Sequence, residues 1–160
     1  RFVLDKACEQ AVWYGRGPLE TYPDCKEGNA IGCWEKNVED FYFPYVLPQE
    51  TGNHEDTRWA AFVTEAGNGI CIASDKEFSF GALHYTQENL TQATHTNELH
   101  RTENIQLSVD YAQHGLGSAS WGAECLEKDK LYPEPFTFTW KIFGTEKESL
   151  AERAEQYRRK

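Results

Sequence analysis

Alternating apolar and polar residues mark two long stretches of this chain as β-strands. The alternation has a period of two over residues 105–112 and again over residues 136–143, which is typical of strands with one buried face. Another run of β-forming residues reaches Tyr14 and is halted by the Gly-Arg-Gly-Pro sequence of residues 15–18, and residues 1–4 are also strand-like. These patterns predict an all-β protein.

The centre of the chain predicts an antiparallel meander of three strands. Residues 58–64 and 70–73 are rich in apolar residues and flank residues 65–69, which contain an Asn-Gly pair of the kind that favours tight hairpins. Residues 78–85 follow as the third strand. The preceding Thr-Gly-Asn-His sequence of residues 51–54 predicts a turn.

Loops and two short helices are predicted outside these strands. Residues 28–32 predict a loop because they combine glycine and asparagine. Thr86 is placed to cap a short helix over residues 86–93. Residues 145–148 (Thr-Glu-Lys-Glu) match a capping box, which predicts a C-terminal helix over residues 146–159.

Composition narrows the fold class and excludes two kinds of partner. The length of 160 residues, without an internal repeat or a boundary, predicts one domain over residues 1–160. An aromatic content of 14% favours β-structure with wide contact surfaces. The net charge of −10 would repel a nucleic acid backbone, and no apolar run approaches the about 18 residues of a membrane span.

The five cysteines are scattered and odd in number, and no two of them form a CxxC pair. They are Cys8, Cys25, Cys33, Cys71 and Cys125. This predicts buried free thiols in a reducing compartment, hence a cytoplasmic location, rather than a disulfide framework. The chain opens on Arg1 without an initiator methionine or a secretory segment, so the sequence looks like a cut into a longer polypeptide.

The spacing of the titratable residues matches no known catalytic motif and no metal-binding motif. No pair of carboxylates lies in a motif that would desolvate one and leave the other ionised, and no Gly-x-Ser-x-Gly elbow is present. His84, His95 and His100 are spaced by eleven and five residues, which is poor geometry for metal ligands. They are better explained as hydrogen-bonded structural histidines or as polar lining of a pocket, and His95 is the one to follow.

Trp121 is the most informative single residue. It lies in a run of glycine, serine and alanine over residues 114–122, so it has few local neighbours that could bury it. Its indole either returns to the core or projects as a platform for the apolar face of a sugar ring, and the residues alone leave these alternatives even. Residues 115–117 (Gly-Leu-Gly) are interpreted as the hinge of this binding loop.

Eleven short motifs follow one another in an order that resembles a known family. They are Trp13-Tyr14-Gly15-Arg16-Gly17-Pro18 with Glu20, Tyr22-Pro23-Asp24, Tyr45-Val46-Leu47-Pro48-Gln49-Glu50, Gly52-Asn53, Arg58-Trp59, Phe78-Ser79-Phe80, Leu83-His84-Tyr85, His95, Glu98-Leu99, Asp110-Tyr111 and Gly115-Leu116-Gly117. In this order they resemble the C-terminal small-chain domain of glycoside hydrolase family 2 β-galactosidases, over about residues 12–143.

The resemblance implies an antiparallel β-sandwich of the galactose-mutarotase-like supersandwich class, of which this chain holds a part, with a short C-terminal helix. In that family two glutamates of a TIM barrel carry out retaining hydrolysis of terminal β-D-galactosides such as lactose, so no catalytic residue is expected in this chain. Trp121 matches the position of a loop tryptophan that contacts the sugar, with His95 and His84 as further substrate-binding candidates. Many relatives have Cys-Gly-Pro where this chain has Trp-Gly-Ala at residues 121–123.

The leading hypothesis is therefore a β-galactosidase domain that is inactive alone. Its expected partners are a galactoside, the remaining domains of the same enzyme and further copies in a homo-oligomer. No cofactor is expected in this chain, since any Mg or Na of the full enzyme would be bound outside this domain.

Two other functions stay open. One is a mutarotase-like aldose epimerase, in which His84 or His95 and a carboxylate shuttle protons. The other is a free-standing carbohydrate-binding module. Under all three hypotheses Arg16 and Arg58 are expected to be buried ion-pair partners of loop carboxylates.

Overall fold

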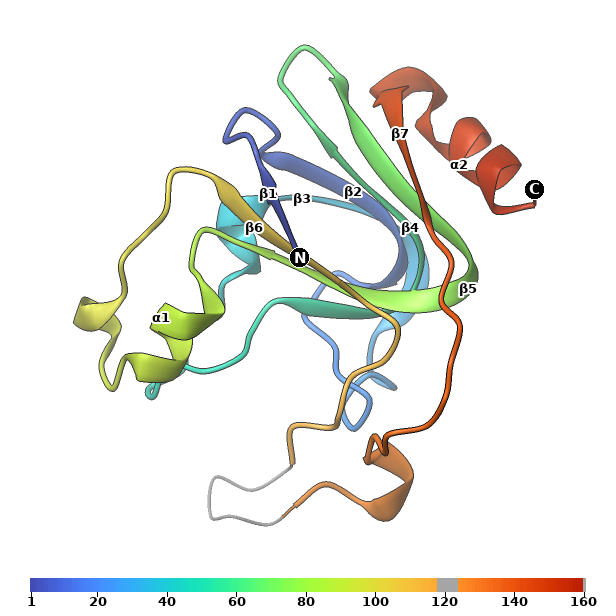
Figure 1. Cartoon of the computed structure of the whole chain (residues 1–160). Helices are drawn as coiled ribbons and strands as arrows, with labels where there is room; N and C mark the ends of the chain where they lie inside the picture. Colours follow the sequence, from blue (N-terminus) through green and yellow to red (C-terminus); the bar gives the residue numbers. More distant parts are fainter. Residues whose placement is uncertain (118–123, 160) are drawn as a thin grey trace.

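The computed structural model of the chain shows antiparallel strands that form a strongly curled sheet (Figure 1). It describes residues 1–117 and 124–159. The strands are β1 (Phe2–Leu4), β2 (Gln10–Gly17), β3 (Ala30–Asn37), β4 (Asn53–Val63), β5 (Asn68–Leu83), β6 (Ile105–Asp110) and β7 (Lys141–Glu146). The helices are α1 (Gln87–Gln92) and α2 (Leu150–Arg158), with the 3-10 turns η1 (Val38–Phe41), η2 (Thr96–Glu98), η3 (Glu127–Asp129) and η4 (Lys147–Ser149). The predicted all-β class with a short C-terminal helix is confirmed.

The strands form a seven-stranded sheet in the order β1-β6-β5-β4-β2-β3, and β7 also pairs with β5. Strand β5 organises this sheet because β4 follows it along one side while β7 and β6 share the other. β7 pairs with the first part of β5, from Asn68 to Ala73, and β6 pairs with the second part, from Ser79 to Leu83. The arrangement is sandwich-like without being a closed barrel, and its assignment to the supersandwich class stays a prediction.

The predicted three-stranded meander is wrong, because residues 70–73 and 78–83 belong to one strand. The polar Ser-Asp-Lys-Glu sequence of residues 74–77 was interpreted as a break, yet it stays within β5 at the place where β7 pairing has ended and β6 pairing has not begun. The hairpin turn also differs from the prediction. Gly67, with φ of 82°, donates to the carbonyl of Thr64 at 2.8 Å, and the Asn-Gly pair already belongs to β5.

Strand β2 continues through the Gly-Arg-Gly sequence that was predicted to halt it. A Cβ atom on Gly15 would lie 2.7 Å from Oγ1 of Thr57, so glycine here allows β2 and β4 to approach closely. Gly17 pairs with Ala30 of β3, so the predicted loop over residues 28–32 is confirmed for residues 28 and 29, while residues 30–32 belong to the strand. The predicted turn over residues 51–54 is half correct, because Gly52 has φ of 77° while Asn53 opens β4.

The C-terminal elements are shifted along the chain from their predicted positions. The last strand begins at Lys141, since the alternation over residues 136–140 is not matched by sheet pairing. Thr145 pairs with Gly69 inside the sheet, so it does not cap a helix, and α2 begins at Leu150 after η4.

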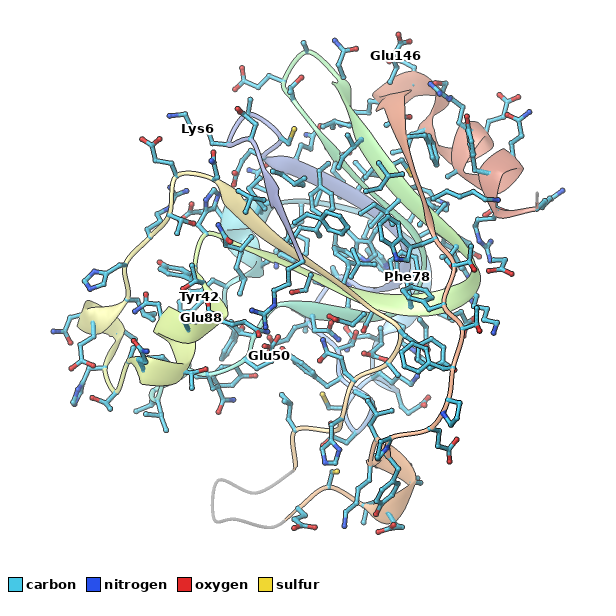
Figure 2. The ribbon with its side chains drawn as sticks, viewed as in Figure 1. Lys6, Tyr42, Glu50, Phe78, Glu88 and Glu146 are labelled. Carbon is cyan, nitrogen blue, oxygen red and sulfur yellow. The ribbon has the colours of Figure 1, made fainter. Side chains whose placement is uncertain are left out.

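Two groups of buried side chains stabilise the fold, as Figure 2 illustrates with the side chains drawn. The larger group lies inside the curled sheet and includes Trp13, Phe41, Phe62, Phe80 and Leu107. The second group lies between the sheet and α2, and its buried members are Trp59, Ala61, Cys71, Ala73, Phe143, Leu150 and Ala154. Helix α2 therefore covers part of the outer face of the sheet.

All five cysteines are free thiols, as predicted, but only some are buried. Cys71 and Cys125 are buried, whereas Cys25 and Cys33 are exposed. Among the described residues, no helix combines the length and apolar character that crossing a membrane requires.

His54 is a histidine enclosed by aromatic rings. Its ring stacks on Phe80 with centroids 5.2 Å apart and meets the edge of Trp13 at 4.6 Å. Nδ1 lies 3.1 Å from the carbonyl oxygen of Gly52, which can only accept, so Nδ1 carries the proton. Burial lowers the pKa of His54 from 6.5 to about 3, and the ring is therefore neutral in the folded protein.

His54 should make stability depend on pH. Because the unfolded chain protonates this ring near pH 6.5 and the folded chain near pH 3, the unfolded state binds more protons between these values. Stability is full above about pH 6.5 and declines by about 1.4 kcal/mol per pH unit as the pH falls toward 3. Urea unfolding between pH 7 and 4 should show this slope as the difference between His54→Phe and the wild type, and as the same difference between His54→Phe and the exposed His95→Gln control, because buried carboxyls with raised pKa values such as Glu50 and Glu55 contribute with the opposite sign. A His54→Phe variant with an unchanged slope would contradict the assignment.

Two strand glycines make a matched test of packing. A Cβ atom on Gly69 would lie 2.0 Å from the carbonyl oxygen of Phe62, whereas one on Gly144 would have no neighbour within 4 Å. Gly69→Ala should therefore lower the free energy of unfolding by about 2 kcal/mol or more, and Gly144→Ala by less than about 0.5 kcal/mol. Chemical denaturation of both variants measures the difference, and equal effects would show that the strand pairing at Gly69 is wrong.

Candidate functional site

Asn53, the first residue of β4, joins two loop segments to this strand at one end of the sheet. Its side-chain nitrogen donates to the carbonyl oxygen of Thr21 at 2.8 Å and to Oε1 of Glu55 at 2.9 Å. Its side-chain oxygen accepts from Nε2 of Gln113 at 3.0 Å. A fully buried amide with all three contacts satisfied fixes the relative positions of these segments.

Glu20 fastens the connection between η1 and β4 to the loop that follows β2. Its Oε2 accepts from Oγ1 of Thr51 at 2.9 Å and from the backbone nitrogen of Gly52 at 2.7 Å. Its other oxygen accepts from the hydroxyl of Tyr45. Burial of the phenol, together with the hydrogen bond to Glu20, raises the pKa of Tyr45.

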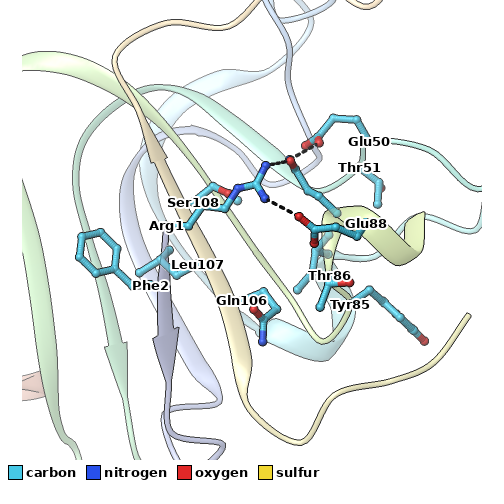
Figure 3. A pocket seen from close by; sticks show the side chains of 13 residues that line it. Arg1, Phe2, Glu50, Thr51, Tyr85, Thr86, Glu88, Gln106, Leu107 and Ser108 are labelled. Atoms are coloured by element: carbon cyan, nitrogen blue, oxygen red, sulfur yellow. Dashed lines mark hydrogen bonds and ion pairs between the residues drawn. The ribbon is translucent and has the colours of Figure 1, made fainter. Parts of the chain in front are cut away.

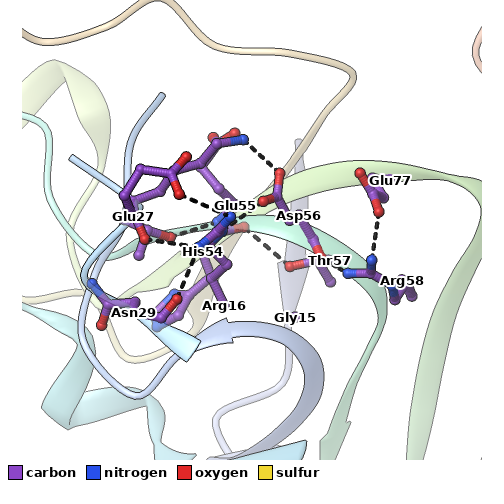
Figure 4. A network of polar contacts seen from close by, with 12 residues as sticks. Gly15, Arg16, Glu27, Asn29, His54, Glu55, Asp56, Thr57, Arg58 and Glu77 are labelled. Atoms are coloured by element: carbon purple, nitrogen blue, oxygen red, sulfur yellow. Dashed lines mark hydrogen bonds and ion pairs between the residues drawn. The ribbon is translucent and has the colours of Figure 1, made fainter. Parts of the chain in front are cut away.

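Arg16, Asp56 and Lys26 form an ion-pair network beside Asn53 (Figure 4). Nε of Arg16 lies 2.6 Å from Oδ2 of Asp56, and Nζ of Lys26 lies 2.6 Å from Oδ1 of the same carboxylate. Burial of the Asp56 carboxyl opposes its ionisation, but the two cations prevail and hold its pKa below the usual value. Arg58 pairs with Glu77 at 2.5 Å. The prediction that both arginines form ion pairs is confirmed, but both side chains are only half-buried, and the partners Asp56 and Glu77 lie in strands β4 and β5 rather than in loops.

Asp24 holds the backbone that leads into residues 118–123. Its two oxygens accept from the backbone nitrogens of Leu116 at 3.3 Å and Gly117 at 2.8 Å. Carboxylate-to-amide hydrogen bonds of this kind are stronger than neutral ones. We call Leu116, Gly117 and Asp24 the entry clamp.

His114 ties the two ends of the same segment together. Nδ1 accepts from the backbone nitrogen of Leu131 at 3.0 Å, so the proton of the neutral ring lies on Nε2, which is 3.4 Å from Sγ of Cys125. The backbone nitrogen of the adjacent Gly115 donates to the carbonyl oxygen of Asp129 at 2.8 Å. The residues on both sides of 118–123 are therefore fastened to each other.

An aromatic groove lies between these same flanking segments. The rings of Tyr111 and Phe136 stack with centroids 4.6 Å apart and planes at 6°. Together with Tyr132 and the carboxylates of Glu77 and Asp110, they line an open groove of about 960 Å³. Aromatic faces beside carboxylate oxygens can contact both the apolar face and the hydroxyls of a sugar.

A second, smaller cavity offers less space for a ligand. It has a volume of about 50 Å³ and is lined by Glu50, Thr86 and Leu107 among others (Figure 3). Glu50 accepts from Nε2 of Gln87 at 2.8 Å, and burial together with the nearby Asp110 raises the pKa of Glu50. The volume is far below the about 300 Å³ of typical ligand sites.

Of the sequence-predicted site residues, the structure describes His84 and His95, which lie in different environments. Trp121 lies outside the described residues. His84 is buried directly after β5, with Nε2 2.8 Å from Oε2 of Glu9 and Nδ1 3.1 Å from the carbonyl oxygen of Thr102. His95 is exposed at the start of η2, where its partner is Glu98.

Comparison with known proteins identifies the family. A family model described as "Beta galactosidase small chain" matches residues 1–142. The chain is 34% identical over 140 residues to a β-galactosidase of Staphylococcus xylosus, which covers 88% of the chain and 14% of that protein. It is 38% identical over 123 residues to β-galactosidase BgaC of Bifidobacterium adolescentis, covering 74% of the chain and 12% of that protein. A β-galactosidase of Kluyveromyces lactis is 34% identical over 143 residues, covering 88% and 14%.

The chain belongs to the β-galactosidase small-chain family. It spans only 12–14% of the length of these relatives. Several motifs that carried the resemblance in the sequence converge at this end of the small-chain domain. Glu20 and Asp24 lie in the loops just described, and Gln113 contacts both Asn53, which begins β4, and Asp110, which ends β6.

Sequence reasoning named these motif residues without assigning them roles. Asp24 was part of the Tyr-Pro-Asp motif, but the amides that it binds lie more than ninety residues further along the chain. Gln113 and His114 carried no signal at all, since neither belongs to a motif. The one hint in the sequence for the entry clamp of the small-chain domain was the Gly-Leu-Gly loop of residues 115–117, whose backbone amides need an acceptor from elsewhere in the chain.

Removing the entry clamp should free the backbone at Gly117. Asp24→Ala deletes an acceptor whose charge-assisted bond is worth about 1.5 kcal/mol or more, so the amide of Gly117 should exchange with deuterium at least about tenfold faster. Leu116→Ala is the matched control, because Leu116 contributes its backbone nitrogen and its side chain is exposed. Exchange rates measured by NMR that are equal in Asp24→Ala and the wild type would contradict the clamp.

Proposed function

We propose that this chain is the C-terminal domain of a retaining β-galactosidase and presents the loop of residues 118–123 to the galactoside. Membership of the small-chain family supports the enzyme class. The observation that carries the loop assignment is the fastening of its flanking segments. Asp24 holds the backbone at Leu116 and Gly117, and His114 joins this side to Cys125 and Leu131 on the other. A binding loop needs such a rigid support.

The proposed substrate contact is Trp121. An indole that covers about 60 Å² of a sugar ring stabilises it by about 1.5 kcal/mol at roughly 25 cal/mol per Å², which corresponds to about tenfold in affinity. The aromatic groove of Tyr111 and Phe136 supports a carbohydrate ligand near the flanking segments. The substrate-binding roles of His95 and His84 stay predictions.

The hydrolytic chemistry is assigned to other domains of the same polypeptide. Retaining hydrolysis uses two carboxyl groups about 5 to 5.5 Å apart that flank the scissile bond, and the resemblance places these glutamates in a TIM barrel. The domain is therefore expected to be inactive alone and to act with its neighbouring domains in a homo-oligomer. A cytoplasmic location is part of this proposal, supported by the five free thiols.

The epimerase alternative gains little support from the geometry. It needs a histidine and a carboxylate that can both reach a sugar, and His84 with Glu9 is such a pair at 2.8 Å. However, both ring nitrogens of His84 already have partners, and only 3% of its side chain is exposed. Polarimetry of the purified domain separates the two functions, because measurable mutarotation would favour the epimerase. Calorimetric sugar binding by the isolated domain would instead favour the free-standing carbohydrate-binding module.

The decisive variant is Trp121→Ala in the intact enzyme that carries this domain. Loss of the indole should weaken galactoside binding by about tenfold or more, seen as a raised KM for a terminal β-D-galactoside. Leu126→Ala is a matched control on the other side of the loop, because Leu126 is also apolar and is exposed. If KM and kcat are unchanged in Trp121→Ala, the proposed contact is wrong.

A further inference from the structure

His84, Glu9 and Glu39 converge from three separate parts of the chain. Glu9 lies directly before β2, Glu39 lies in η1 and His84 directly follows β5. One nitrogen or oxygen atom from each residue lies within 4.8 Å of the other two. The group borders an open cleft of about 470 Å³, so an ion can reach it from solvent.

The ring of His84 is held with one nitrogen directed at the carboxylate of Glu9. Nδ1 faces the carbonyl oxygen of Thr102 at 3.1 Å, and because a carbonyl can only accept, Nδ1 carries a proton. The backbone nitrogen of Thr102 donates in turn to the carbonyl oxygen of His84 at 2.7 Å, which fixes the ring further. A carbonyl partner on the far nitrogen is the usual support of a metal-binding histidine.

The contact between His84 and Glu9 requires a positive centre. A neutral ring protonated at Nδ1 presents a lone pair at Nε2, and Oε2 of Glu9, 2.8 Å away, presents lone pairs as well. Either a proton, carried by the ring or by the carboxyl, or a bound cation must lie between these atoms. The other oxygen of Glu9 accepts from the backbone nitrogen of Glu39 at 2.8 Å, which holds this carboxylate in place.

The charges around the cleft are compatible with a divalent cation. A neutral imidazole and two carboxylates sum to −2, in a chain whose net charge is −10. Arg101 binds one oxygen of Glu39, with Nε at 3.1 Å from Oε2, and this carboxylate has a second oxygen. Lys6 is directed toward Glu103 at 3.5 Å. Arg101 is therefore in position to orient Glu39 from outside the metal site, as hydrogen-bonded neighbours of ligating carboxylates do.

We propose that His84, Glu9 and Glu39 form a binding site for a divalent transition metal ion, with Zn²⁺ as the best fit. Imidazole nitrogen and carboxylate oxygen are ligands that zinc takes at about 2.0 to 2.2 Å, and three protein ligands leave the fourth position for water. Mn²⁺ should bind more weakly at the same ligands. The ion would join the start of β2, η1 and the end of β5.

This site goes beyond the proposed function and does not depend on it. It also departs from the expectation of a metal-free chain, which considered only the spacing of His84, His95 and His100. The structure separates those histidines into different environments and places two glutamates beside the first of them.

Zinc binding by the purified, metal-stripped protein without an affinity tag tests the proposal. Equilibrium dialysis followed by elemental analysis should show one more equivalent of zinc in the wild type than in Glu39→Gln, and the affinity for it should fall at least about tenfold in Glu39→Gln and Glu9→Gln. Glu39 is exposed, so its replacement should not unfold the protein. Glu103→Gln is the matched control, since Glu103 lines the same cleft outside the ligand set, and it should bind as the wild type does.

NMR of the His84 ring gives a second measurement that does not depend on variants. Zinc should shift the Nε2 resonance while Nδ1 stays protonated, and it should raise the thermal midpoint of the wild type but not of Glu39→Gln. Absence of the extra equivalent, or zinc binding that is equal in Glu39→Gln, Glu9→Gln and wild type, would overturn the proposal. A ring that keeps protons on both nitrogens in the presence of zinc would overturn it too.

Discussion

The carboxylate of Asp56 is the point on which the loop end of the sheet depends. Asp56 lies where the pairing of β4 with β5 shifts register, and its φ of 51° is in the left-handed region. Such a backbone is costly for a residue other than glycine. It is offset because Arg16 and Lys26 both bind the side chain while Arg58 donates to the carbonyl oxygen at 2.6 Å. Strands β2 and β4 are thereby joined at the bend.

The bend explains why residues far apart in the sequence meet in the loops. Before Asp56, strand β4 supplies Asn53 to the loop segments and His54 to the aromatic core. After the bend, alternate residues of β4 serve the core inside the curled sheet and the layer under α2. One strand therefore supports both the packing of the domain and the loop that Asp24 holds in place.

Sequence patterns predicted the class of fold and several elements well, because burial of one face leaves a strong period of two in β6. They failed where a pattern had two physical explanations. Gly15 was interpreted as a strand end, although its small size serves close packing against Thr57. The prediction divided β5 into two strands at the polar residues 74–77, although an extended strand can cross a gap between two partners. The contacts of Asp24 and Glu9 could not be predicted, because each joins segments whose distance in sequence leaves no periodic trace.

The entry clamp recognises main-chain amides rather than side chains. Asp24 thus imposes a shape on residues 116 and 117 while being indifferent to the side chain at position 116. Within a protein family, such an arrangement lets position 116 vary without moving the segment that follows, whereas Gly117, with φ of 85°, favours glycine. The sequence of the loop can therefore change while the position of its backbone is preserved.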